Sequence, residues 1–174
     1  MNGSVIRRVV GYVLTLEALL LLLPCIVALY YNEQEGYAYL ASSAICLVLG
    51  GAMSLKKPKS NVFYLKEGCV ATALSWIVLS VFGAIPFVLT GEIPHFVDAL
   101  FETVSGFTTT GASILSDVET LANCTLFWRS FTHWIGGMGV LVFILAMIPL
   151  SGGSNMNLMR AESPGPSVSK IVPK

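Results

Sequence analysis

The stretch FETVSGFTTTGAS, residues 101–113, decides how this sequence folds. It places three threonines and a glycine directly after a short apolar segment, in a chain of 174 residues that is 55% hydrophobic and 11% charged. Soluble domains carry about 25% charged residues. This composition, with a mean hydropathy of +0.75, therefore indicates an integral membrane protein. A polar, flexible segment inside such a chain requires an explanation.

Four apolar stretches are each long enough to cross a bilayer, which takes about 20 residues in a helix. They cover residues 9–31, 37–55, 70–89 and 126–150. Nine of the ten Lys and Arg residues flank these stretches on one side of the membrane, and Arg129 is the exception. By the positive-inside rule the basic side is cytoplasmic. We therefore expect both termini to be cytoplasmic and the outer face to be acidic.

The first stretch has the basic start and apolar core of a signal peptide, but Glu17 interrupts the core and no small-residue cleavage site follows it. We therefore expect this stretch to remain as a membrane span. An ionisable residue at membrane depth is a candidate for function. For Glu17, a structural polar contact or snorkelling to the interface is the favoured interpretation, and a place on an ion pathway is the alternative.

A short helix is predicted between the third and fourth stretches, over HFVDALFETVSGF at residues 95–107. Pro94 is well placed to open this helix, and about a dozen residues are too few to cross a bilayer. Its apolar residues recur three to four apart on one face, and they are Phe96, Val97, Leu100, Phe101 and Val104. The chain then returns through TTTGAS, which describes a re-entrant segment. Irregular backbone at membrane depth has to be buried in protein or to line a water-filled cavity.

The TTTG segment has the composition of a cation site. An extended loop can direct successive backbone carbonyls at a small cation and replace its water shell. Threonine adds a hydroxyl oxygen without charge, and Gly111 can adopt a positive φ. The carbonyl end of the preceding helix adds a partial negative charge. A threonine- and glycine-rich surface turn between two spans is the alternative that the pattern leaves open.

Three motifs carry a resemblance to a known family. They are SGFTTTGAS at residues 105–113, WIGGMG at 134–139 and RAESPGP at 160–166. Together with the looser pattern of the whole chain, they resemble the first pore unit of the Trk/Ktr/HKT potassium-transporter superfamily, and most closely the membrane subunit of bacterial Trk systems. The resemblance implies an all-α integral membrane protein with two N-terminal transmembrane helices followed by one helix–pore loop–helix repeat of a potassium-channel-like fold.

The resemblance also implies boundaries within the chain. Residues 1–66 would hold the N-terminal helix pair and a basic cytoplasmic loop. Residues 67–151 would hold the helix–pore loop–helix repeat. Residues 152–174 would be a cytoplasmic tail or a linker toward a second repeat.

The selectivity filter follows from the same resemblance, residue by residue. It would be formed by Thr108, Thr109, Thr110, Gly111 and Ala112, with potassium held by the backbone carbonyls of Thr109, Thr110 and Gly111. Gly111 matches the family's filter glycine, so its substitution is expected to weaken selectivity.

The residues around the loop have two interpretations each. Asp98 and Glu102 would shape an acidic vestibule, or would have a solvated or hydrogen-bonded role behind the filter. His133 beside Trp134 indicates an interfacial pair more than a pH sensor. Gly136, Gly137 and Gly139 indicate close helix packing, with a hinge as the alternative.

The chain departs from the family in carrying one pore loop, whereas a filter of this kind needs four. An N-terminal part of a longer protein is the favoured interpretation. A short subunit that tetramerises, or that joins a separately encoded remainder, is the alternative. Two functions follow: potassium uptake as part of a Trk-type subunit, or a non-conducting fragment or membrane assembly module. Sodium permeation stays open, because selectivity depends on the other three walls.

The expected partners follow from the resemblance as well. They are the lipid bilayer, the remaining pore repeats, a second complete subunit in a homodimer, and a cytoplasmic nucleotide-binding regulatory protein of the TrkA/KtrA type. The expected location is the bacterial plasma (inner) membrane. The net charge is zero, which does not suggest a nucleic-acid partner. The sequence shows no nucleophile–base pair or metal cluster, so we expect neither an enzyme nor a cofactor, with potassium as the transported ion.

Overall fold

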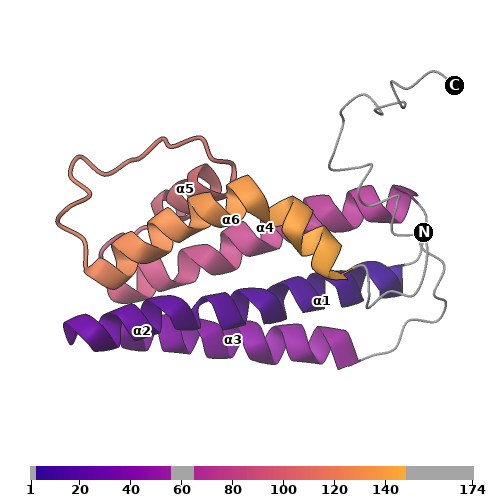
Figure 1. The fold of residues 1–174 in the computed structure, drawn as a ribbon, viewed down its shortest axis with the longest axis horizontal. Coiled ribbons are helices and arrows are strands. Elements are labelled where there is room, and N and C mark those ends of the chain that lie inside the picture. The colour runs from indigo at the N-terminus through magenta and orange to yellow at the C-terminus, as the bar shows by residue number, and fades with distance from the viewer. Residues whose placement is uncertain (1–2, 56–64, 148–174) are drawn as a thin grey trace, which may run out of the picture.

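The described part of the chain is a bundle of six helices. The computed structural model describes residues 3–55 and 65–147, except for the side chains of residues 65, 66, 69 and 139–147. Figure 1 shows the long helices lying side by side, with a shorter helix and a long loop at one side of the bundle. In chain order the helices are α1 (Gly3–Leu20), α2 (Leu22–Tyr31), α3 (Gly36–Leu55), α4 (Leu65–Thr90), α5 (Phe96–Phe107) and α6 (Asn123–Met147).

The expected membrane spans correspond to these helices. Three described segments are long and apolar enough to cross a membrane: Gly3–Tyr31, which joins α1 and α2, then Gly36–Leu55 and Val70–Thr90. The fourth expected span corresponds to α6 (Asn123–Met147). Residues 148–150 of this expected span lie outside the described residues.

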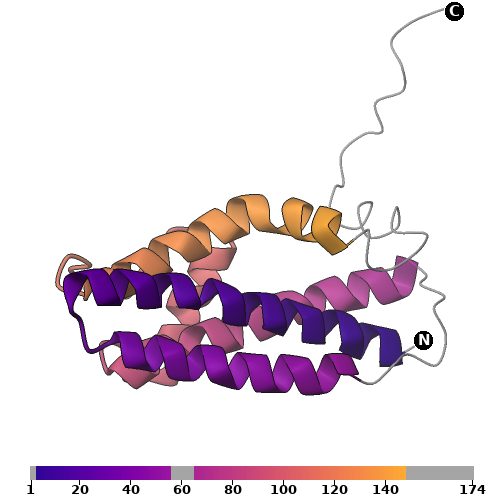
Figure 2. The same ribbon diagram turned by 60° about the horizontal axis from the view of Figure 1, so that its bottom comes forward.

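The helices alternate in direction, as the charge pattern predicts. The start of α1, the end of α3, the start of α4 and the end of α6 lie at one end of the bundle (Figures 1 and 2). Arg7 and Arg8 lie in the first turns of α1, at this end. The short connections that carry Glu33 and Glu92 lie at the other end, and the long loop that carries Asp117 returns to that end before α6. One end of the bundle is therefore basic and the other acidic over the described residues.

Small residues allow α1 and α3 to pack closely. A Cβ atom at Gly50 would lie 2.7 Å from Thr15 Oγ1 and 2.8 Å from the Gly11 carbonyl oxygen. A Cβ atom at Gly11 would in turn lie 2.9 Å from the Gly50 carbonyl oxygen. Ser43 donates a hydrogen bond of 2.6 Å from its hydroxyl to the Ala18 carbonyl across the same interface. Glycine and hydroxyl residues at helix contacts are the usual way to bring membrane helices together.

One hydrophobic core connects the first helix pair to the re-entrant segment. Buried residues of all six helices contribute to it, among them Leu14, Ala28, Tyr39, Phe87, Ala99 and Trp128. Trp128 donates a hydrogen bond of 3.0 Å from its indole N–H to the Gly83 carbonyl, and Tyr39 donates one of 3.1 Å to Thr125 Oγ1. Both bonds join α6 to earlier helices. The boundary expected near residue 66 stays a prediction.

Two carboxylates from other connections hold the first turn of α6. Glu33, between α2 and α3, accepts hydrogen bonds from the backbone N–H groups of Asn123 at 2.8 Å and Cys124 at 2.9 Å. Glu92, after α4, accepts one of 2.6 Å from the Ala122 N–H. The first N–H groups of a helix have no partner within the helix, and negative charge is favourable there. These contacts place the start of α6, and hence the end of the loop, against the rest of the bundle.

The Gly50 contact predicts an asymmetry between two neighbouring glycines. Gly50→Val should destabilise the bundle by about 1–3 kcal/mol, because the added atoms meet backbone of α1 and force the helices apart. Gly51→Val is the matched control, since a Cβ atom at Gly51 meets nothing within 4 Å. Denaturant unfolding of the detergent-solubilised chain measures both. Equal effects of the two substitutions would contradict the close-packing account.

The Glu33 contact predicts a dependence of stability on pH. Desolvation of Glu33 opposes its ionisation, but the hydrogen bonds from Cys124 and Asn123 outweigh it and lower the pKa of this carboxyl below its usual value. The stabilisation is therefore present above the unfolded-state pKa of about 4.3, and it is lost as the pH falls through the folded-state value. Glu33→Gln should flatten this acidic limb of a stability–pH curve. Glu35→Gln, which changes a carboxylate with no hydrogen bond in the described structure, should leave it unchanged.

Candidate ion-binding loop

The loop begins with a set of backbone hydrogen bonds to the last turn of α5. The N–H groups of Thr108, Thr109 and Thr110 donate to the carbonyls of Val104, Gly106 and Ser105, each at 2.9 Å. Thr108 also donates from its hydroxyl to the Val104 carbonyl at 2.7 Å. The final carbonyls of a helix have no partner within the helix, and here the loop itself supplies the donors. The start of the loop is thereby fixed to α5.

The far end of the loop is fixed by two buried side chains of the same helix. Glu102 accepts hydrogen bonds with one carboxylate oxygen from the Ser113 hydroxyl at 2.6 Å and the Ile114 N–H at 2.7 Å. Ser105 donates from its hydroxyl to the Ala112 carbonyl at 2.6 Å. Residues 112–114 therefore lie against α5, although they follow it by several residues in the sequence. The loop is therefore anchored to α5 at both ends.

The middle of the loop has three carbonyls without a hydrogen bond. Among the described residues, no donor contacts the carbonyl oxygens of Thr109, Thr110 or Gly111. The carbonyls on either side are occupied: Thr109 Oγ1 donates to the Thr108 carbonyl at 2.7 Å, and Ser105 occupies that of Ala112. Two residues of this segment have a left-handed backbone conformation, with φ of 55° at Thr109 and 74° at Gly111. A left-handed conformation at a threonine is strained and is typical of functional loops.

Close contacts between α5 and α6 fix the position of the end of α5, where the loop begins. Gly136 on α6 faces the backbone of Phe107, the last residue of α5, so closely that a Cβ atom at Gly136 would overlap the Phe107 carbonyl. Gly106 on α5 faces a side chain, and a Cβ atom there would overlap that of Thr132. The prediction of close helix packing is thus confirmed at Gly136. A Cβ atom at Gly137 would have its nearest contact, Thr109 Cγ2, at 3.9 Å.

An ion pair under the loop explains the isolated basic residue of the outer half. Arg129 Nε donates to the second oxygen of Glu102 at 3.0 Å, and the side chains are 17% and 1% exposed respectively. The Glu102 carboxylate is therefore buried and hydrogen-bonded behind the loop, and the vestibule role considered for it stays a prediction. Asp98, one turn earlier, is half-buried and makes no side-chain hydrogen bond in the described structure.

The buried face of α5 is mostly polar and its exposed face is apolar, which is the reverse of a helix in a soluble protein. The buried face carries Glu102, Thr103, Ser105 and Gly106, together with Ala99 and Phe107. Most of the apolar stripe is exposed, including Phe96, Val97, Phe101 and Val104. The helix begins at Phe96 with His95 as its N-cap, so Pro94 precedes the helix and does not open it. An exposed apolar face on a short helix indicates that lipid or further protein lies against it.

Glu17 lies deep in the bundle, next to the backbone of α4. Its side chain is 1% exposed, and a Cβ atom at Gly83 would lie 3.2 Å from its Oε1 and 3.0 Å from Thr103 Cγ2. Neither carboxylate oxygen has a hydrogen-bond partner among the described residues. The snorkelling interpretation of Glu17 is therefore wrong, because the side chain is enclosed between α1, α4 and α5. Its role stays a prediction.

Sequence reasoning missed the most specific contacts of the loop. It weighed Glu102 only as a vestibule or background residue, and it treated Arg129 as an exception to the charge pattern. That exception was the available signal, since a lone basic residue on an acidic side requires a carboxylate partner. The role of Ser105 could not be predicted from the sequence, because its hydrogen bond to the Ala112 carbonyl forms only where the loop turns back toward α5.

The buried pair predicts a measurable coupling. Glu102→Gln or Arg129→Gln should each destabilise the folded chain by about 3–5 kcal/mol, because each leaves one buried charge uncompensated. The double substitution should cost less than the sum, with an interaction energy of about 1–3 kcal/mol. Asp98→Asn is the control, and its effect should add to that of Arg129→Gln within about 0.5 kcal/mol. Additive effects at Glu102 and Arg129 would contradict the pair.

Comparison with known proteins places this architecture in a family. The TrkH family of cation transport proteins matches residues 35–172. TrkG of Escherichia coli, a Trk system potassium uptake protein, is 36% identical over 180 residues, covering all of this chain and 37% of TrkG. TrkH of the same organism is 36% identical over 170 residues, covering 95% of this chain and 35% of TrkH. An uncharacterised cation transporter of Methanocaldococcus jannaschii is 37% identical and covers 84% of this chain.

A solved structure agrees with the sequence relatives. The crystal structure of the potassium transporter TrkH from Vibrio parahaemolyticus matches with a TM-score of 0.76 and 30% identity, over 93% of this chain and 36% of that protein. The chain spans about a third of the length of these relatives, and the matched proteins are transporters, not enzymes. The expected all-α, multi-pass membrane fold is confirmed. The chain belongs to the TrkH family of cation transport proteins.

Proposed function

We propose that this chain supplies one wall of a potassium-selective filter in a Trk-type uptake subunit. The observation that supports this most strongly is the run of three carbonyls, from Thr109 to Gly111, that lack donors between two anchored ends of the loop. A dehydrated potassium ion needs oxygen ligands that are already unpaired and fixed in place. The three carbonyls are those of the potassium set expected from the family resemblance.

The charge balance of the loop favours a monovalent cation that is bound and released. Residues 108–114 contain no ionisable side chain, and the nearest carboxylate, that of Glu102, is neutralised by Arg129. The loop therefore offers dipoles and hydroxyls without a net charge. Conduction requires binding that is strong enough for entry and weak enough for exit, and neutral oxygen ligands satisfy both conditions.

One loop cannot enclose an ion, so the remaining walls come from elsewhere. Residues 108–114 are exposed along their whole length, and the apolar stripe of α5 beside them is exposed as well. Three further repeats, from the rest of a longer chain or from other subunits, would cover both surfaces. The proposal includes cytoplasmic termini in a bacterial inner membrane, a homodimer of complete subunits and gating by a nucleotide-binding protein of the TrkA/KtrA type.

The test is potassium uptake by a strain that lacks its own uptake systems. This chain should restore growth at low potassium only when it is joined to the remaining two thirds of a relative such as Escherichia coli TrkH. Rescue by the chain alone would instead favour a tetramer. Absence of rescue by the joined protein, despite normal amounts in the membrane, would favour a non-conducting assembly module.

Gly111 provides the sharper prediction within the joined protein. Gly111→Ala should reduce the potassium-over-sodium preference by about tenfold, because a strain of about 1–3 kcal/mol at positive φ shifts the neighbouring carbonyls. Gly91→Ala is the matched control: Gly91 has a φ of 78°, and a Cβ atom there also meets open space. Flux of rubidium and sodium into vesicles measures the preference. An equal reduction of the potassium-over-sodium preference in both variants would indicate a general effect of backbone strain and would contradict the filter role.

A further inference from the structure

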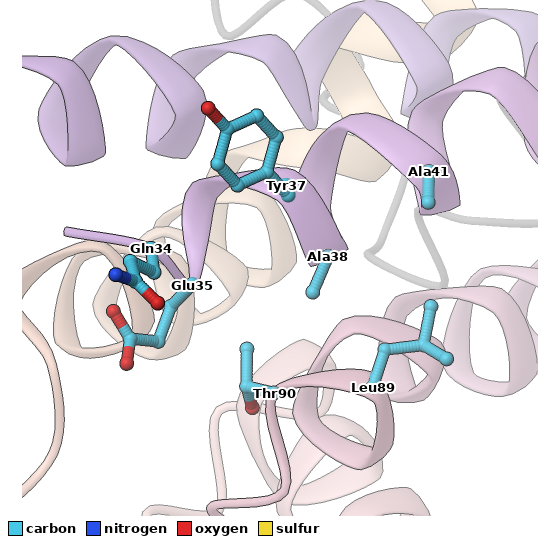
Figure 3. Close-up of a pocket in the computed structure, with 7 residues that line it drawn as sticks. All are labelled: Gln34, Glu35, Tyr37, Ala38, Ala41, Leu89 and Thr90. Atoms are coloured by element: carbon cyan, nitrogen blue, oxygen red, sulfur yellow. The ribbon is translucent and has the colours of Figure 1, made fainter.

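A groove opens between α3 and α4 at the acidic end of the bundle. It encloses about 450 Å³ and is lined by Gln34, Glu35, Tyr37, Ala38, Ala41, Leu89 and Thr90. Figure 3 shows Ala38 and Ala41 of α3 facing Leu89 of α4, with Glu35 near Thr90 at one end. The groove exists because two alanines one helical turn apart leave space that larger side chains would fill. Its volume lies within the range of about 300–1,000 Å³ typical of ligand sites.

The groove lies at the depth of a membrane–water interface. Tyr30, Tyr31 and Tyr37 cluster around the turn between α2 and α3, and all three are exposed, Tyr30 by 80% and Tyr37 by 77%. Exposed tyrosines at the end of apolar helices mark the level of lipid headgroups. The groove runs from this level along two helices that expose aliphatic side chains, Leu40 and Leu89 among them. Its apolar walls thus face the acyl region and its polar end faces the headgroups.

The polar end carries an uncompensated negative charge. Glu33 and Glu92, at the same end of the bundle, accept hydrogen bonds from the first turn of α6. The Glu35 carboxylate, by contrast, has no hydrogen bond or ion pair among the described residues. Of the described Lys and Arg residues, Arg129 is the one that lies away from the basic end of the bundle, and it is already paired with Glu102. A ligand that brings a cationic group fits this end, and one with a net negative charge does not.

We propose that the α3–α4 groove binds a zwitterionic phospholipid, with its ammonium group at Glu35 and one acyl chain against Ala38, Ala41 and Leu89. The Gln34 amide oxygen provides a further acceptor beside Glu35, and the Thr90 hydroxyl at the same end already donates to the Phe87 carbonyl and accepts from the Glu92 N–H. An ammonium headgroup satisfies the free carboxylate, and the acyl chain fills the apolar part. The site is separate from the ion-binding loop and does not depend on the transport proposal.

Native mass spectrometry of the purified chain tests the site with two probes, phosphatidylethanolamine and phosphatidylglycerol of identical acyl chains. The wild-type chain should retain the ethanolamine lipid about tenfold better, because a charge-assisted hydrogen bond to Glu35 discriminates the two headgroups. Glu35→Gln should reduce this preference to about twofold or less. Glu119→Gln, which changes an exposed acid in the loop before α6, should leave it unchanged.

The acyl part of the site has its own variants. Ala41→Phe should fill the groove and remove the most tightly held lipid, whereas Ala44→Phe, at an exposed position of α3 outside the groove, should not. Loss in Ala41→Phe alone, together with the Glu35 effect, supports the site. Equal retention of both lipids by the wild type, an unchanged preference in Glu35→Gln, or a groove filled by a second copy of the chain would overturn it.

Discussion

The contact between Glu102 and Arg129 is the constraint on which the loop depends. One oxygen of the Glu102 carboxylate holds the returning end of the loop, and the other binds α6 through Arg129. The same side chain thus fixes three segments, namely α5, the loop and α6. Glu102 is 1% exposed and Arg129 17%, so water can solvate the carboxylate hardly at all and the guanidinium only in part. Removal of either one leaves a charge that the site cannot solvate.

The rest of the bundle positions this contact. Gly136 and Gly106 let α6 approach the end of α5 closely, so that Arg129 reaches Glu102. Glu33 and Glu92 hold the first turn of α6 from two connections on the far side. The N-terminal helix pair is therefore more than a peripheral addition, since Glu33 lies between its two helices. The positive φ at Thr109 is held by the hydrogen bonds that the N–H groups of Thr109 and Thr110 donate to the last turn of α5.

The sequence predicted the helical elements and the site to different degrees. Hydropathy located the long helices, since bilayer thickness imposes a length and a composition on each. The short helix was predicted within a residue of its observed start, and the loop after it was recognised from its polarity. The apolar stripe of α5 could not be assigned to a buried or exposed side, because in a membrane both sides of a helix meet apolar surroundings. The contacts of Ser105 and Glu102 depend on a chain reversal that periodicity does not encode.

Amide hydrogen exchange in the loop tests the central role of Glu102 most directly. The Ile114 N–H, which donates to Glu102, should exchange slowly in the wild-type chain although the residue is exposed. In Glu102→Ala, exchange at Ile114 should approach the rate of an unprotected amide, while amides in α1 and α3 keep their protection. Rapid exchange of Ile114 in the wild type, or protection that survives Glu102→Ala, would contradict the account.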